Sequence, residues 1–272
     1  MRSGSIKERR ALIKSFVESC ECTEEGAEYF LKQCYWNLER AINTYLNDKR
    51  AQRMYKKRQP VLGDLFDEVV SHEGENAGAI DDIELLASRL NVDPNGLALF
   101  ILSWKLDCKK LGVFSRDEWI DGLTLSFNGI GSFEDIRENL LKLESEVLLS
   151  LDNFRPLYEH IFELVSQNGK NIPALSASDL LEDVLPEGLF KFKSPFIKFL
   201  REEEEKRKEE YLDEHSGDEM GYKPSVVSRD TWVMFLDFNK AMDPKLENYD
   251  ECDSWPLIMD EFVDWSRETW LK

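Results

Sequence analysis

Two stretches of the sequence place oxygen-bearing side chains and a glycine at the spacing of a calcium-binding loop. Such a loop has ligands at positions 1, 3, 5 and 12, Gly at 6 and an apolar residue at 8. Residues 73–84 and 107–118 keep part of this frame, but position 5 is Ala77 or Leu111 and position 3 of the second is Lys109. The glycine and apolar positions are Gly78, Ile80, Gly112 and Phe114. The pattern favours helix–loop–helix units without calcium ligands; a coincidental match and a calcium sensor remain as alternatives.

The remaining chemistry-bearing residues form no catalytic or metal-binding set. Cys20 and Cys22 are one residue apart, whereas zinc knuckles and redox pairs need two between them. No histidine lies at a metal-ligand spacing from a cysteine, and no glycine-rich phosphate loop is present. Acids are abundant, but nothing singles out a general acid–base pair. We therefore expect no catalytic residue, no metal, no cofactor and reduced thiols.

Carboxylates are concentrated near the end of the chain. Residues 237–264 contain nine acids, opposed only by Lys240 and Lys245. Such a segment predicts an acidic surface that meets a basic partner, with association that is sensitive to salt.

Helices are the elements expected to position these residues, because convincing period-two alternation is absent and glycine is sparse. Ile80, Ile83, Ala87 and Leu90 should share one helix face, and Asp93-Pro94 should open a buried helix that includes residues 97–106. Two closing helices should begin after Ser228 and near Ser254. Further helices are expected at 115–126, 132–149, 152–167, 177–185 and 190–212.

Composition bounds the partners and the compartment. The 272 residues include 54 acids and 35 bases, a net charge of −19, which argues against nucleic acid as a partner. No apolar run reaches the roughly 18 residues of a membrane span, so we expect no membrane insertion and a soluble protein of the cytoplasm and nucleus. Residues 1–58 carry a net charge of +5 and the remainder −24, which indicates two modules.

Two segments within these modules are especially rich in charge. Residues 49–58 hold six bases and no acid, which reads as an exposed linker or, alternatively, as a nuclear-import or phosphate-binding patch. Residues 201–219 are charged and low in complexity, and should extend a helix past the core before a loop.

The first module resembles a ubiquitin-associated domain. Its expected third helix, Trp36-Asn37-Leu38-Glu39-Arg40-Ala41-Ile42-Asn43-Thr44-Tyr45-Leu46, has the aromatic, alanine and late aromatic–leucine positions of that family. The match covers about residues 7–48. It departs from the family in the first loop, where Cys22-Thr23 replaces the usual Met-Gly-Phe-like turn.

The remainder resembles the potentiating-neddylation domain of the defective-in-cullin-neddylation family. The resemblance covers about residues 62–268, and the segment 202–222 looks like an insertion. The motifs that carry it include Ile80-Asp81-Asp82-Ile83, Ser103-Trp104-Lys105-Leu106, Arg229-Asp230-Thr231-Trp232, Asn248-Tyr249-Asp250-Glu251 and Ser254-Trp255-Pro256-Leu257. It implies an all-α chain: a three-helix ubiquitin-associated-like domain at 7–48, a basic linker at 49–61 and a helical domain at 62–272 containing two degenerate EF-hand-like units.

The resemblance also implies a function. Members of this family are scaffolds, not enzymes, that promote transfer of the ubiquitin-like modifier Nedd8 (Rub in yeasts) to a cullin lysine. They bind the cullin's C-terminal winged-helix region and the acetylated N-terminus of the neddylation conjugating enzyme. Ubiquitin or Nedd8/Rub would be a further partner of residues 7–48. A ubiquitin-binding adaptor without a neddylation role remains an alternative.

Site residues follow from the family's motifs. Its cullin-binding Asp–Ala–Asp trio corresponds to Asp230, Ser254 and Asp260, with serine in place of alanine. The alternative interpretations are a first-turn acid favoured by the helix dipole for Asp230, simple N-capping for Ser254 and a solvated face for Asp260. The family's apolar groove for the conjugating enzyme would be lined by Ile83, Leu99, Leu102, Phe114, Leu164, Leu181 and Val184; ordinary core packing is the alternative for all seven.

Overall fold

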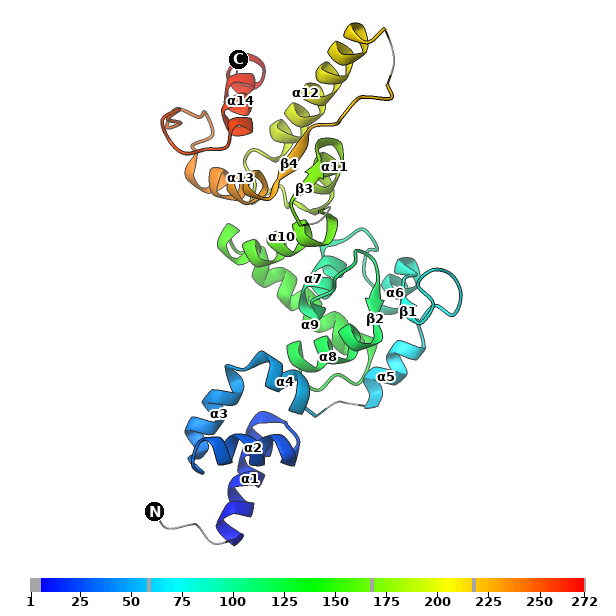
Figure 1. Cartoon of the computed structure of the whole chain (residues 1–272), viewed down its shortest axis with the longest axis vertical. Helices are drawn as coiled ribbons and strands as arrows, with labels where there is room; N and C mark the ends of the chain where they lie inside the picture. Colours follow the sequence, from blue (N-terminus) through cyan, green and yellow to red (C-terminus); the bar gives the residue numbers. More distant parts are fainter. Residues whose placement is uncertain (1–5, 58–59, 167–168, 217–218, 272) are drawn as a thin grey trace. The chain divides into compact units, whose positions relative to one another are not determined.

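The computed structural model describes residues 6–57, 60–166, 169–216 and 219–271. Across these residues the chain is built of helices, with short strands in two antiparallel pairs (Figure 1). The all-α prediction is therefore confirmed. Arg58 of the basic stretch and the expected helix end at residue 167 lie outside the described residues. The chain divides into a first unit (Met1–Asn91, Lys105–Cys108 and Gly112–Asn139) and a second unit (Val92–Trp104, Lys109–Leu111 and Leu140–Lys272).

The first unit opens with a small helical bundle. Its three leading helices are α1 (Ile6–Cys20), α2 (Glu24–Gln33) and α3 (Leu38–Leu46). Thr23 caps α2 through its hydroxyl, which accepts a hydrogen bond from the Gly26 amide at 3.2 Å. Phe16 and Phe30 pack edge-on against the ring of Tyr45, with centroid distances of 5.7 and 5.4 Å. Three aromatic rings thus form the centre of this small core, and aliphatic residues such as Leu31 and Ala41 are buried with them.

A fourth helix, α4 (Lys49–Tyr55), occupies the basic stretch. Ala51 is buried in the same core, and the Thr23 amide donates to the Tyr55 carbonyl at 2.7 Å. The Lys57 amide donates to the Glu21 carbonyl at 2.8 Å. This part of the basic stretch is therefore helical and packed, whereas the sequence alone suggests an exposed linker.

The two calcium-loop frames are joined by a strand pair. β1 (Ala79–Ile80) runs antiparallel to β2 (Phe114–Ser115), and Ile80 pairs with Phe114. These are the position-8 residues of the two frames, and the position-6 glycines have φ angles of +87° and +68°, which favour glycine. The paired-loop geometry predicted from the spacing is present. Ile80, however, lies in a strand and not on the face of α6 (Ile83–Leu90), because the loop needs an extended residue there.

The first unit also contains α5 (Pro60–Asp67) and α8 (Arg116–Ser126). α7 (Leu97–Leu106) belongs to the second unit as far as Trp104. Trp119 of α8 is fully buried, and its indole N–H donates to the Leu62 carbonyl at 3.0 Å. The sequence analysis places Pro94 in the first turn of α7, but residues 93–96 form a separate turn. The Asp93 carbonyl accepts from the Gly96 amide there, so α7 begins at Leu97.

The second unit contains a further pair of helix–loop–helix segments. β3 (Asn171–Pro173), between α10 (Leu151–Val165) and α11 (Ala174–Val184), pairs antiparallel with β4 (Val226–Ser228). β4 follows the 22-residue helix α12 (Lys193–Glu214) and leads into α13 (Arg229–Ala241). The remaining elements are α9 (Phe133–Val147), α14 (Leu257–Trp265) and a π-helical turn, Ser266–Trp270.

An aromatic core holds the second unit together. The rings of Tyr158 and Trp232 stack at 4.6 Å. The Tyr158 hydroxyl donates to the Trp232 carbonyl at 2.9 Å, and the Trp232 indole N–H donates to the Tyr158 carbonyl at 3.0 Å. These reciprocal bonds satisfy both buried polar groups and fix α13 against α10. The start of α13 is thereby held rigidly. No described helix is long and apolar enough to cross a membrane.

Candidate functional site

The first turn of α13 presents Asp230 to solvent. Ser228 caps this helix, accepting from the Thr231 amide at 3.1 Å, as its position in the sequence predicts. Thr231 is buried and anchors the first turn of the helix, whereas the adjacent Asp230 is exposed. Within the described residues no hydrogen bond or ion pair engages the Asp230 carboxylate, which leaves it available to a basic group.

Asp260 lies in the first turn of α14 and is held by a tyrosine. The Tyr249 hydroxyl donates a hydrogen bond to one oxygen of its carboxylate. Burial, followed by this bond, raises the pKa of Tyr249 well above its ordinary value. The phenol therefore stays a donor across the neutral range, and Asp260 is held in one orientation with its second oxygen open to further bonding.

The loop between α13 and α14 places both Tyr249 and Ser254. It is braced by reciprocal bonds: Asp243 accepts from the Asn248 amide at 2.9 Å, and Asn248 accepts from the Asp243 amide at 2.9 Å. Ser254 is exposed in this loop. It does not begin a helix as the sequence analysis expects; α14 starts at Leu257, with Pro256 as its cap residue.

A groove lies between the start of α14, the start of α13 and the outer part of α12. Its volume is about 440 Å³. Buried Phe199 and Leu200 contribute apolar atoms, while Val226 is 48% exposed and Leu257 71% exposed. The full lining is Phe199, Leu200, Glu203, Arg207, Pro224, Ser225, Val226, Ser228, Thr231, Pro256, Leu257, Ile258 and Glu261. Thr231 next to Asp230, Glu261 next to Asp260 and Pro256 two residues after Ser254 thus border one groove.

The seven apolar residues of the predicted conjugating-enzyme groove are mostly buried. Ile83 and Leu164 are half-buried. Ile83 and Phe114 belong to the first unit and the other five to the second. Their grouping remains a prediction of the sequence. The five buried members are Leu99, Leu102, Phe114, Leu181 and Val184.

The second calcium-like loop, residues 107–118, uses its acids for structure. Asp107, at position 1, forms an ion pair with Arg53 at 3.0 Å. Glu118, at position 12, accepts from the Ser115 amide at 2.9 Å in a capping box. In the described part of the chain no group of three or more His, Cys, Asp or Glu side chains is arranged to hold a metal.

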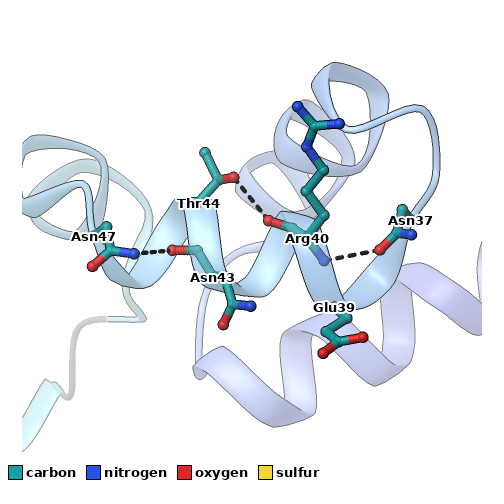
Figure 2. A pocket seen from close by; sticks show the side chains of 6 residues that line it. All are labelled: Asn37, Glu39, Arg40, Asn43, Thr44 and Asn47. Carbon is teal, nitrogen blue, oxygen red and sulfur yellow. Dashed lines mark hydrogen bonds between the residues drawn. The ribbon is translucent and has the colours of Figure 1, made fainter.

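A second hollow, of about 360 Å³, lies along α3 (Figure 2). Its polar side chains bond to their own helix: Asn37 accepts from the Arg40 amide at 2.9 Å, and Asn47 donates to the Asn43 carbonyl at 2.8 Å. These are local bonds of three and four residues' spacing, so the hollow is a solvated helix face and holds no arrangement for catalysis.

Sequence reasoning missed Tyr249 and the two exposed groove residues. Tyr249 stands in a motif that carries the family resemblance, but its role depends on a loop that brings residues 249 and 260 together. Val226 and Leu257 look like core residues in the sequence. The available signal was their position near a helix start: Val226 lies two residues before the cap Ser228, and Leu257 directly follows Pro256.

Comparisons with known protein families match two segments of the chain. Residues 135–265 match a family described as cullin binding, and residues 10–52 match a UBA-like domain. The first match contains Asp230, Ser254 and Asp260 and the whole lining of the 440 Å³ groove.

Several similar proteins carry names from one pathway. Human DCN1-like protein 4 is 25% identical over 202 residues, 74% of this chain and 59% of that protein. Defective in cullin neddylation protein 1 of Caenorhabditis elegans is 24% identical over 269 residues, 96% of this chain and 90% of that protein. The protein of that name from Cryptococcus neoformans is 24% identical over 249 residues, 90% and 88% of the two chains.

The chain spans about six-tenths of the human and zebrafish DCN1-like protein 4 sequences, and nearly the full length of the worm and fungal proteins. The UBA-like match overlaps the expected domain at 7–48, and the cullin-binding match covers the later part of the expected 62–268, beyond the motifs at 80–83 and 103–106. The chain has a UBA-like match followed by a cullin-binding match, and it is similar to proteins named for cullin neddylation.

Proposed function

We propose that this protein promotes cullin neddylation as a scaffold that has no catalytic residue of its own. The observation that carries the proposal is the cullin-binding match over residues 135–265, which includes the exposed Asp230 and Ser254 and the half-buried Asp260. Asp230 and Asp260 would pair with basic side chains of the cullin's C-terminal winged-helix region. Ser254 is small enough to allow close approach between them.

The second partner would be the neddylation conjugating enzyme. Its acetylated N-terminus would enter the apolar groove predicted from Ile83, Leu99, Leu102, Phe114, Leu164, Leu181 and Val184, in the manner of a helix laid in a groove. Holding the donor and the acceptor on one scaffold raises their effective concentration and restricts their orientation. The rate of transfer would rise without any new chemical step.

Reconstituted neddylation tests the proposal. Purified cullin, modifier and its two enzymes are assayed with and without the protein, and we expect faster modification with it. The double variant Asp230→Ala with Asp260→Lys should remain folded, lose binding to the cullin and abolish the stimulation. Wild-type binding by this variant would show that the trio is wrongly assigned, and an unchanged rate with the wild-type protein would refute the function.

A second partner class is suggested by the UBA-like match over residues 10–52. We propose that this domain contacts ubiquitin or Nedd8/Rub, although its first loop is engaged by the backbone of Tyr55 and Lys57. In an NMR titration with ubiquitin, chemical-shift changes at α3 would show binding through that helix. Changes at the first loop would show binding through the loop despite its backbone contacts. Deleting residues 1–58 should leave the stimulation of neddylation intact if the acidic module is sufficient.

We also propose that the protein acts in both cytoplasm and nucleus. The exposed bases of α4 support this, since clustered Lys and Arg are typical of import signals. Imaging a fluorescent fusion of the wild type and of a variant with Lys49 and Arg50 changed to Gln would test it.

A further inference from the structure

The charged segment that begins at Arg201 contains one buried acid. Most side chains of α12 beyond this point are exposed or half-buried, but Glu204 is only 3% exposed. A buried carboxylate is costly unless its oxygens are hydrogen-bonded. Its burial shows that this part of the helix is covered by another segment of the chain.

The covering segment is the stretch that leads into β4. The Tyr222 hydroxyl donates to Glu204 at 2.8 Å, the Ser225 amide donates at 3.0 Å, and the Ser225 hydroxyl donates a third bond. Figure 1 shows this stretch running beside α12 toward β4. Glu204 therefore pins residues 222–225 to the helix extension.

The pinned segment forms one wall of the groove described above. Pro224, Ser225 and Val226 line it, with Glu203 and Arg207 of the α12 extension beside them. The opposite side is the start of α14, where Leu257 leaves 71% of its side chain in water. The segment that looks like an insertion in the sequence thus builds an apolar groove with exposed aliphatic edges.

The groove is continuous with the acidic surface. It is lined by Ser228 and Thr231, on either side of Asp230, and by Glu261, next to Asp260. Arg207 is the one cation of the lining and is paired with Glu261 at 3.5 Å, so the lining keeps a negative charge through Glu203. Apolar surface bordered by acids suits an apolar side chain that is flanked by basic ones.

We propose that this groove receives an apolar side chain of the cullin's winged-helix region, presented beside the basic residues that meet Asp230 and Asp260. The inference rests on the proposed function and names a second part of the same contact. It assigns a role to the charged segment: α12 beyond Arg201, held to residues 222–225 by Glu204, provides the wall that selects an aliphatic or aromatic side chain. A partner without that side chain would bind through charge alone.

Exposed aliphatic residues allow a test that does not disturb the core. Leu257→Ser and Val226→Ser, together, remove apolar contact area from the edges of the groove. Leu149→Ser is the matched control, because Leu149 is 75% exposed and does not line the groove. Equal thermal midpoints for the three proteins establish that all are folded.

The measurement is the affinity for a purified cullin winged-helix fragment, by calorimetry at three salt concentrations. We expect the Leu257/Val226 double variant to bind at least about tenfold more weakly, a change of about 1.4 kcal/mol, with an unchanged slope against salt. Leu149→Ser should bind as the wild type does. The Asp230→Ala/Asp260→Lys variant should instead show no measurable binding at any of the three salt concentrations.

Three outcomes would overturn the inference. Wild-type affinity of the Leu257/Val226 variant, with binding lost by the acidic variant, refutes the groove and leaves the proposed function standing. No binding of the fragment by the wild-type protein refutes both. Dimerisation of the wild type that the Leu257/Val226 variant abolishes, with cullin affinity unchanged, would assign the groove to a second copy of the chain.

Discussion

Replacing Glu204 is the most direct test of how the charged extension is built. Glu204→Leu keeps a side chain of similar size and removes both acceptor oxygens. Glu204→Gln keeps one acceptor oxygen and removes the charge. Glu205→Gln is the matched control, because Glu205 is exposed on the same turn of α12.

The expected magnitude follows from the three hydrogen bonds. Bonds to a charged acceptor contribute about 1.5–3 kcal/mol each, and an unpaired buried donor costs about 1–3 kcal/mol. Leucine would regain part of this because it avoids desolvating a carboxylate. The donors of Tyr222 and Ser225 are only part-buried and would regain some water. A net loss of about 3 kcal/mol is therefore expected for Glu204→Leu.

Glutamine should cost less. Its side-chain carbonyl oxygen can accept from Ser225, and its side-chain amide NH₂ can donate to the Tyr222 hydroxyl, which is able to act as an acceptor. The loss is then the charge assistance, about 1 kcal/mol. The exposed control Glu205→Gln should stay within about 0.5 kcal/mol of the wild type.

Urea unfolding measures the change in overall stability, and amide hydrogen exchange measures the local protection of the Ser225 amide. Stability should fall in the order Glu205→Gln, Glu204→Gln, Glu204→Leu, and the Ser225 amide should lose protection in Glu204→Leu. Burial and the bond to Glu204 raise the pKa of Tyr222 to about 12, so that pKa should fall in the leucine variant. A leucine variant as stable as the wild type, with Ser225 still protected, would refute the pinning.

Three further predictions concern other parts of the chain. Gly26→Ala should lower the thermal midpoint, because the new Cβ would lie 2.5 Å from the Tyr55 Cβ and overpacking costs about 1–3 kcal/mol, more than the roughly 1 kcal/mol of added helix propensity. Hydrogen bonds from loop groups lower the pKa of Asp135, so Asp135→Asn should reduce stability above about pH 4, with the difference vanishing as pH falls through the native pKa in pH-dependent unfolding. Tyr249→Phe frees the Asp260 carboxylate and should weaken cullin binding several-fold in calorimetry.

Each of the three has its own check. Gly188→Ala, where an added Cβ meets nothing within 4 Å, should leave the midpoint unchanged, and a stabilised Gly26→Ala would show that α4 is not packed on α2. A pH-independent effect of Asp135→Asn would contradict the ionic origin. Equal loss of binding in Tyr249→Phe and in Tyr35→Phe, an 81% exposed control, would contradict a specific role for the Tyr249 hydroxyl.

Much of the fold follows from local patterns in the sequence. Ser228 and Thr23 are good caps, and both begin or precede helices as expected. The spacing around Gly78 and Gly112 anticipates the paired loops, because a left-handed glycine and an apolar strand residue are local requirements. Helix starts marked by proline are less predictable: α7 begins three residues after Pro94 and α14 directly after Pro256.

Contacts between distant residues could not be predicted in the same way. Tyr55 meets the first loop of the UBA-like bundle through backbone atoms, which leave no trace in the residue type. Glu204 reads as one of four successive acids, Glu202 to Glu205, and only the returning segment 222–225 distinguishes it from its neighbours. The acidic trio could be located by motif, but the groove beside it depends on that returning segment.

Charge and apolar contact would contribute to cullin binding in separable ways. A surplus of acids beyond residue 58 steers a basic partner and raises the association rate. At physiological ionic strength, salt largely screens this attraction beyond about 8 Å. Apolar burial at Leu257 and Val226 is insensitive to such screening and acts mainly on the dissociation rate. Variants of Asp230 should therefore change the association rate most at low salt, whereas variants of Leu257 should change the dissociation rate equally at all salt concentrations. If both classes altered only the association rate, the groove would lie outside the contact and charge alone would account for binding.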